Sequence, residues 1–208
     1  QDNNTVIYSG SLSWDNVIGG DGTWTAIHPS NPDVMYGSYQ YLGNIFMTTN
    51  RGESWYGLGP PGHDPASFVA PYVVSPSNPE VIYAGRTQVY KTKNNGASWW
   101  RVNMGEPLDG NPLLCLAVAK SNEDIVYAST APIEKRAGVF VTVDGGIKWT
   151  DISSGLPDRY PVDIALDPIE PSFAYITFSG FGTPHIYKTT DMGESWQDIS
   201  NGLPDVRT

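Results

Sequence analysis

The sequence predicts an all-β protein assembled from repeated four-stranded antiparallel units, and three observations support this prediction. The 208 residues include 22 Gly and 17 Pro but are only 16% charged, a composition that suits short strands joined by turns. A skeleton of the form Thr-x-Asp/Asn-x-Gly-x-x-Trp occurs four times. A turn rich in Pro, Ser and Asn, followed by an apolar run that ends in Tyr, recurs at nearly the same interval.

The Thr-to-Trp skeleton, called the box below, can be understood from its residue types. Asp or Asn folds its side chain onto backbone N–H groups two residues on. Gly supplies a positive φ, and Trp begins the return strand and is large enough to fill the seam between two stacked units. Each box is therefore predicted to be a structural hairpin rather than a catalytic element. The four boxes comprise Thr48, Asn50, Gly52 and Trp55; Thr92, Asn94, Gly96 and Trp99; Thr142, Asp144, Gly146 and Trp149; and Thr189, Asp191, Gly193 and Trp196.

Each repeat reads as four strands, which in the last repeat are expected at residues 162–166, 172–178, 186–189 and 196–199. A four-stranded unit of about 45 residues, repeated along a chain, is the sequence form of a β-propeller blade. The fold class predicted is therefore a β-propeller of four-stranded antiparallel blades, with about four complete blades and a partial one. The complete blades are expected approximately over residues 22–58, 68–104, 112–153 and 161–200.

Residues 1–21 are expected to form the partial blade, with 5–10 and 13–18 as its last two strands and Trp14 in the anchoring role. Propellers carry about 4–8 blades and close into a ring that leaves no open edge. Residues 1–208 are therefore expected to be a single segment of a larger propeller. Two alternatives remain: a small ring with the partial blade overlapping, or two chains paired as a head-to-tail dimer.

The boxes resemble the Asp-box (BNR) repeat of sialidase-like and sortilin-like β-propellers, and the resemblance covers essentially the whole chain. Asn50 and Asn94 depart from the family pattern by replacing Asp, but Asn can make the same turn. In that family the box is a folding device that lies away from the binding face. Residues 1–3 and 19–22 are similar to a passage in large secreted bacterial Asp-box proteins. The resemblance implies a secreted or cell-surface bacterial protein, and it specifies architecture rather than activity.

Composition and patterning exclude several classes of function. The net charge of −10, the pI near 4.5 and the lack of a basic stripe predict no nucleic-acid partner. No apolar stretch approaches the roughly 20 residues of a membrane helix, so no membrane insertion is expected. Cys115, the single cysteine, lies in an apolar run and is expected to be a buried thiol. No metal or cofactor is expected, because His28, His63 and His185 are scattered and residues 19–22 lack a calcium-loop or phosphate-loop pattern.

Two sets of loops are expected to share one face, called the top face, opposite the boxes: those between second and third strands, and those between a fourth strand and the next first strand. Loops on a rigid scaffold are where function concentrates. Aromatic and amide side chains there suit a sugar or an extended peptide, arginines suit a carboxylate, and a His beside an Asp suits an oriented base. The candidates are Tyr39, Gln40, Tyr41, His63, Asp64, Arg86, Asp109, Arg136, Arg159, Tyr160 and His185.

Each candidate also has a structural alternative. A tyrosine can pack between blades, a loop histidine can simply be solvated, and an arginine can pair with a nearby acid. Asp109 can serve turn chemistry, and His185 can cap a strand.

Three functions are compatible with these residues. The first is a non-catalytic propeller module of a secreted or cell-surface protein, which binds a glycan or protein ligand through its top-face loops. The second is part of a glycoside hydrolase, sialidase-like or endoglucanase-like. The Arg-Ile-Pro strand that introduces the sialidase arginines is absent, and no two top-face acids are paired by sequence, although glycoside hydrolysis needs two carboxyl groups about 5–9.5 Å apart. The third is a sortilin-like peptide receptor or an assembly-factor propeller.

Overall fold

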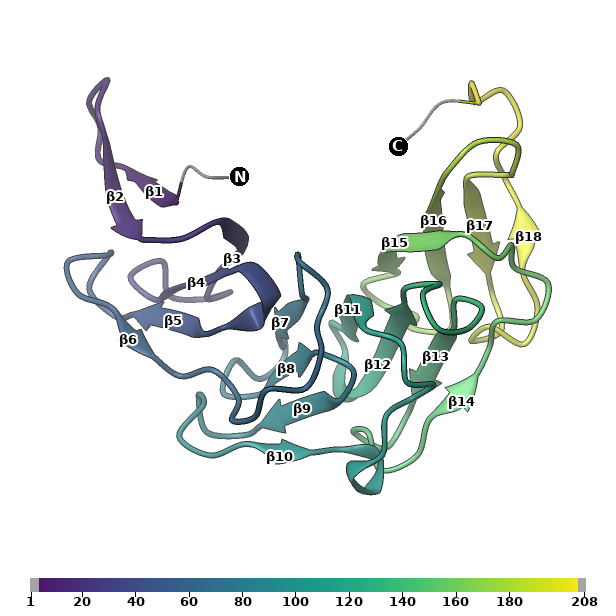
Figure 1. Cartoon of the computed structure of the whole chain (residues 1–208), viewed down its shortest axis with the longest axis horizontal. Coiled ribbons are helices and arrows are strands. Elements are labelled where there is room, and N and C mark those ends of the chain that lie inside the picture. Colours follow the sequence, from purple (N-terminus) through teal and green to yellow (C-terminus); the bar gives the residue numbers. More distant parts are fainter. Residues whose placement is uncertain (1–3, 206–208) are drawn as a thin grey trace.

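The computed structural model describes residues 4–205, and its strands form five antiparallel sheets that fan out as an open arc (Figure 1). The first sheet has two strands and the other four have four strands each. The all-β propeller predicted from the sequence is therefore confirmed. Residues 1–3, with the resemblance noted for them, and residues 206–208 lie outside the described range.

Every sheet is a meander in which consecutive strands pair. The two-stranded sheet contains β1 (Thr5–Tyr8) and β2 (Trp14–Ile18). The next two sheets contain β3 (Gly22–Ile27), β4 (Met35–Tyr39), β5 (Ile45–Thr48) and β6 (Tyr56–Gly57), then β7 (Tyr72–Val74), β8 (Ile82–Gly85), β9 (Val89–Thr92) and β10 (Trp100–Arg101). The last two contain β11 (Leu113–Ala119), β12 (Asn122–Thr130), β13 (Val139–Thr142) and β14 (Thr150–Asp151), then β15 (Tyr160–Leu166), β16 (Ala174–Ser179), β17 (Ile186–Thr189) and β18 (Gln197–Asp198).

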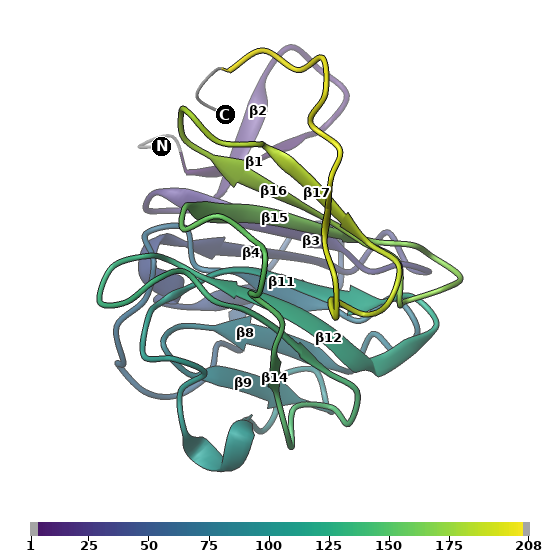
Figure 2. The same cartoon turned by 90° about the vertical axis from the view of Figure 1, so that its right-hand side faces the viewer.

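The four four-stranded sheets are called blades 1 to 4 in chain order. The first strands β3, β7, β11 and β15 contact one another in sequence, so they lie on the inside of the arc. The two ends of the arc, the β1–β2 hairpin and blade 4, do not meet, and the arc is open (Figure 1). In Figure 2, blade 4 lies in front of the hairpin. No helix of the described part is both long and apolar enough to cross a membrane.

All four boxes share one hydrogen-bond pattern, whether they carry Asn or Asp. The threonine hydroxyl donates to the Asn or Asp side chain at 2.7–2.9 Å and accepts from the box glycine N–H at 2.9–3.0 Å. The same Asn or Asp oxygen also accepts a backbone N–H four residues on, at 2.9–3.0 Å. Asn50 and Asn94 thus make the same turn as Asp144 and Asp191, as expected. The N–H two residues on bonds to the box threonine, however, and not to the Asn or Asp side chain that the sequence predicts as its acceptor.

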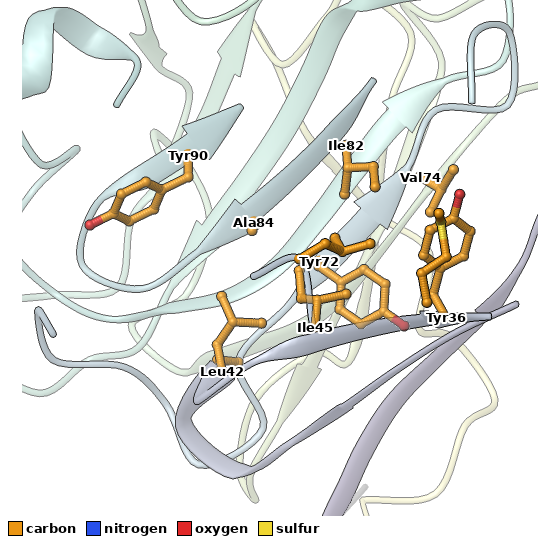
Figure 3. Close-up of a cluster of buried hydrophobic side chains, with 11 residues drawn as sticks. Tyr36, Leu42, Ile45, Tyr72, Val74, Ile82, Ala84 and Tyr90 are labelled. Atoms are coloured by element: carbon orange, nitrogen blue, oxygen red, sulfur yellow. The ribbon is translucent and has the colours of Figure 1, made fainter. Parts of the chain in front are cut away.

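The core lies in the seams between blades rather than within single sheets. Figure 3 shows Leu42 and Ile45 of blade 1 beside Tyr72, Ile82 and Ala84 of blade 2 in one buried cluster. Two further clusters join blade 2 to blade 3 and blade 3 to blade 4. Blade n+1 therefore needs blade n to bury its apolar face.

The box tryptophans reinforce two of these seams. The Trp99 indole N–H donates to the Leu58 carbonyl at 2.6 Å, and the Trp196 indole N–H donates to the Ile152 carbonyl at 2.8 Å. Trp149 is the exception, because its buried indole nitrogen has no hydrogen-bond partner among the described residues.

The first seam differs from the prediction. Trp14 does not take the anchoring role, because it is 59% exposed; its ring lies beside that of Tyr8, with centroids 5.2 Å apart. Ile7 of β1 covers the box glycine Gly52 instead. Consistently, Trp55 bonds within its own box, to the Gly52 carbonyl at 3.1 Å. A two-stranded sheet is too narrow to fill the seam as a whole blade does.

Candidate functional site

A depression on the top face brings together four of the residues that the sequence singles out. Its volume is about 460 Å³, and it lies where three loops of blades 1 and 2 converge. These are the β4–β5 loop (residues 40–44), the β6–β7 loop (58–71) and the β8–β9 loop (86–88). The lining residues are Tyr41, Gly43, His63, Asp64, Pro65, Ala66 and Arg86. We call this depression the top-face pocket.

Tyr41 offers an exposed aromatic ring in a fixed position. Its side chain is 55% exposed, yet its backbone N–H donates to the Phe68 carbonyl at 2.9 Å. The ring meets the Phe68 ring edge-on, with centroids 5.3 Å apart. Tyr41 also has φ 58°, a left-handed conformation that costs energy for a residue with a Cβ. The surrounding contacts therefore hold the ring where a flat ligand surface can stack on it.

Asp64 has a structural role, because it hydrogen-bonds the β6–β7 loop to blade 2 at the wall of the pocket. Its carboxylate accepts hydrogen bonds from the Tyr90 hydroxyl at 2.5 Å and from the Thr87 hydroxyl and Gln88 N–H, each at 3.1 Å. Burial acts to raise the pKa of Asp64, but the hydrogen bonds from Tyr90, Gln88 and Thr87 outweigh it and leave that pKa below its ordinary value. A carboxylate kept ionised and fully bonded is poorly placed to act as a general acid.

Arg86 ties blade 1 to blade 2 beneath the pocket. The side chain is 4% exposed, and its guanidinium donates to the backbone carbonyls of Leu42, at 2.9 Å, and Gly62. It also lies 3.8 Å from Asp64. The Arg86 Nε atom is buried and has no hydrogen-bond partner among residues 4–205. Arg86 therefore supplies the positive charge of the pocket floor while two of its N–H groups bond to backbone carbonyls.

His63 directly precedes Asp64 in the sequence, but among the described residues it makes no hydrogen bond to the Asp64 carboxylate. The described hydrogen bonds of Asp64 come from Thr87, Gln88 and Tyr90. His63 is exposed at the rim of the pocket, where it can donate to or accept from a ligand.

Two neighbouring candidates are structural. Tyr39 packs on Phe46, with ring centroids 5.9 Å apart, and a side chain at Gly43 would collide with the Tyr39 ring. Gln40 accepts the Asp21 N–H at 2.9 Å, and its own N–H donates to the Asp21 carbonyl at 3.1 Å. Gln40 therefore joins the β2–β3 link to blade 1 and does not line the pocket.

The remaining candidates belong to blades 3 and 4 and line other parts of the top face. Asp109 accepts from the Thr130 hydroxyl at 2.6 Å and the Asn111 N–H at 2.8 Å, which is turn chemistry. Arg136 and Arg159 are exposed and donate to carbonyls of the β14–β15 loop, and Tyr160 is 48% exposed. The pocket does not include them.

His185 is 6% exposed, so its ring is not presented to a ligand. Its Nδ1 lies 3.2 Å from the Phe178 carbonyl and its Nε2 lies 3.4 Å from an Asp205 oxygen. Ser200 accepts the His185 N–H at 2.8 Å. These contacts fasten the segment after β18 to the top of blade 4.

Sequence reasoning missed the residues that complete the pocket. Phe68 orients Tyr41, and Pro65 and Ala66 form part of the lining. An apolar residue in a Pro-rich and Gly-rich loop was the available signal for Phe68. No group of three or more His, Cys, Asp or Glu that could hold a metal occurs among residues 4–205.

A second depression of about 400 Å³ lies in the incompletely filled seam between β1 and blade 1. Ile7, Tyr36 and Trp55 line it, together with other largely apolar seam residues. It contains no residue of the top-face loops, so we attribute it to the narrowness of the β1–β2 sheet.

No protein-family model matches the chain, and no curated protein does. Solved structures match in fold. An ancestral GH74 enzyme is 20% identical with a TM-score of 0.69, over 86% of this chain and 27% of that one. The GH74 xyloglucanase from Xanthomonas campestris is 18% identical with a TM-score of 0.69, over 90% of this chain and 31% of that one. YCF48 from Cyanidioschyzon merolae is 14% identical with a TM-score of 0.53, over 85% of this chain and 55% of that one.

The class defined by these matches is the β-propeller, because the GH74 enzymes and YCF48 have propeller folds. The chain spans less than a third of the length of the GH74 enzymes and about half of YCF48. Identities at this level establish a common fold and leave activity to be argued from the site.

Proposed function

We propose that this chain is a non-catalytic β-propeller module of a secreted or cell-surface protein and that its top-face loops bind a glycan or protein ligand. The top-face pocket is the proposed site. The observation that supports it is Tyr41, a half-exposed ring held against Phe68 beside His63. An ordered aromatic face with hydrogen-bonding groups at its edge suits a sugar ring, so a glycan is the favoured ligand.

The charge of the chain indicates whether the proposed glycan is neutral or acidic. A net charge of −10 repels polyanions, and the carboxylate of Asp64 lies within the pocket. The Arg86 guanidinium is already bonded to two backbone carbonyls, so it does not offer a free bidentate face to a ligand carboxylate. We therefore favour a neutral glycan over an acidic one.

The experiment is a glycan array followed by calorimetric titration of the best neutral oligosaccharide. Tyr41→Ala is expected to weaken binding about tenfold, equivalent to about 1.4 kcal/mol. Tyr160→Ala is the matched control, because Tyr160 is a similarly exposed top-face tyrosine outside the pocket. Equal loss in both variants, or no glycan binding at all, would refute the proposal. Capture of a peptide at the same pocket would instead favour the peptide-receptor alternative.

A second candidate function is part of a glycoside hydrolase. The observation that favours it is the fold shared with GH74 enzymes, one of which is a xyloglucanase. Hydrolysis needs two carboxyl groups across the scissile bond. Asp64, however, already accepts hydrogen bonds from Thr87 and Tyr90 of blade 2, and Asp109 accepts them from Asn111 and Thr130. Incubation with xyloglucan, aryl-glycosides and sialosides is expected to release no product. Turnover that is abolished by changing one top-face acid would replace the first proposal with this one.

A further inference from the structure

Neighbouring blades are joined by a set of contacts that recurs at each of the three seams between blades 1 to 4. An apolar residue three positions after a box tryptophan lies under the box glycine of the next blade. A Cβ added to that glycine would come within 2.5–2.8 Å of the apolar side chain. The pairs are Leu58 with Gly96, Val102 with Gly146, and Ile152 with Gly193.

A tyrosine adds to the contact at two of the three seams. The Tyr83 hydroxyl donates to the Glu123 carbonyl of the next blade at 3.0 Å, and the Tyr127 hydroxyl donates to the Pro171 carbonyl at 2.9 Å. Both tyrosines are fully buried. The hydroxyl therefore recognises backbone of the incoming blade, whatever side chain stands there.

The seam between blades 2 and 3 also contains an ion pair between the buried Lys91 and Asp124, whose side chain is 42% exposed. Lys91 is 2% exposed, and its ammonium lies 2.9 Å from an Asp124 oxygen and 3.2 Å from the Gly145 carbonyl. The same ammonium lies 4.9 Å from the centroid of the Tyr83 ring. Tyr83, Lys91 and Val102 thus form the surface of blade 2 on which blade 3 sits.

Blade 4 carries the same residue types at the same positions, on its face that no described blade covers. Tyr175 pairs with Lys188 across β16 and β17, as Tyr83 pairs with Lys91 across β8 and β9. Ile199 stands three residues after its box tryptophan. We call Tyr175, Lys188 and Ile199 the open face.

The open face is exposed where its counterpart is buried. Tyr175 is 38% exposed and Ile199 is 37% exposed, whereas Val102 is 6% exposed. The Lys188 ammonium lies 5.8 Å from the Tyr175 ring centroid, but it makes no ion pair with any residue of the described part. A lysine and two large apolar groups therefore lack the partners that their equivalents have at the seam between blades 2 and 3.

We propose that the open face binds a further four-stranded box blade. That partner would place a box glycine over Ile199, a carboxylate beside Lys188 and a backbone carbonyl at the Tyr175 hydroxyl. A single box blade is the partner that fits, because Tyr175 and Lys188 match the pair on blade 2 that contacts blade 3. The chemistry is that of the seam between blades 2 and 3, and it does not depend on the proposed function.

Blade 3 of this chain can serve as a test partner for the open face. Residues 111–153 hold blade 3, which covers the equivalent face of blade 2. Residues 153–158 lead from blade 3 into β15, and residues 200–205 differ from them at one position. Joining residues 111–153 directly after Asp205 therefore presents a box blade to the open face in the register used within the chain.

Thiol labelling of an Ile199→Cys variant reports whether the face is covered. The native thiol, Cys115, is 3% exposed and is not expected to react with the label in the folded chain. We expect Cys labelling at position 199 to be at least tenfold slower in the extended chain than in the unextended one. Gly146→Val in the appended blade should restore fast labelling, because Gly146 has φ +95° and lies against the seam. Ile147→Val in the appended blade is the control, since Ile147 is 69% exposed.

A charge exchange gives an independent measurement. Lys188→Glu should lower the melting temperature of the extended chain, and Asp124→Lys in the appended blade should restore it. Equal labelling with and without the appended blade, or protection that survives Gly146→Val, would overturn the proposal. Labelling of the unextended chain that slows as its own concentration rises would identify a second copy as the occupant and would also overturn it.

Discussion

Replacing the box glycine Gly96 by alanine tests whether the boxes hold the blades together. Gly96 has φ +80°, and an added Cβ would lie 2.7 Å from the Leu58 Cβ and 2.8 Å from the Leu58 carbonyl oxygen. The left-handed backbone costs alanine about 1–2 kcal/mol, and crowding in a packed seam costs about 1–3 kcal/mol more. We therefore expect the free energy of unfolding to fall by about 2–5 kcal/mol.

Gly155→Ala is the matched control, because Gly155 has φ +83° but nothing within 4 Å of an added Cβ. It should show only the backbone cost of about 1–2 kcal/mol, reduced by the lower entropy of the unfolded alanine chain. The assay is urea unfolding followed by tryptophan fluorescence, with the slope compared between variants. Equal destabilisation by the two substitutions would refute the role assigned to the seam.

Three further predictions follow from individual side chains. Arg86→Lys should lower the free energy of unfolding by about 1.5–3 kcal/mol, because the two carbonyls bond to different guanidinium nitrogens and lysine has only one nitrogen to replace them. The exposed Arg159→Lys should change it by less than about 0.5 kcal/mol. Thermal melts measure both. Hydrogen bonds from the hydroxyls of the box's serine and threonine lower the pKa of Asp191 to about 2, so its contribution to stability is present above about pH 4 and is lost as pH falls toward 2. Asp191→Asn, the residue type found at Asn50, should therefore reduce the fall in urea midpoint between pH 4 and pH 2. Burial raises the pKa of Cys115 to about 12, so a thiol reagent at pH 8 should label it only at the rate of unfolding.

The repeat made the fold predictable from sequence. Thr, Asx, Gly and Trp each have a local role in the box, and the four copies give the same hydrogen bonds at Asn50 and Asp191 alike. Trp14 shows the limit of such reasoning. It matches the repeat in residue type, but the box tryptophans Trp99 and Trp196 bond to the preceding blade, and none precedes β1–β2 in the described part, so its side chain remains exposed.

The pocket could be predicted only in part. Loop topology places Tyr41 and Arg86 on the same face, but it does not show that loops of two different blades converge on one depression. Residues of the same type also differ in burial, which the sequence does not reveal. Arg86 is 4% exposed while Arg159 is exposed, and their sequence contexts do not distinguish them. The use of Asp64 as a hydrogen-bond acceptor depends on Tyr90, which lies far from it in sequence.

The most direct test of the glycan-binding pocket is a crystal structure of the chain soaked with the neutral oligosaccharide that binds most tightly in solution. We expect intact sugar rings stacked on the exposed face of Tyr41, with a hydroxyl within hydrogen-bonding distance of His63. Oligosaccharide bound elsewhere on the arc, or cleaved in the crystal, would contradict this assignment.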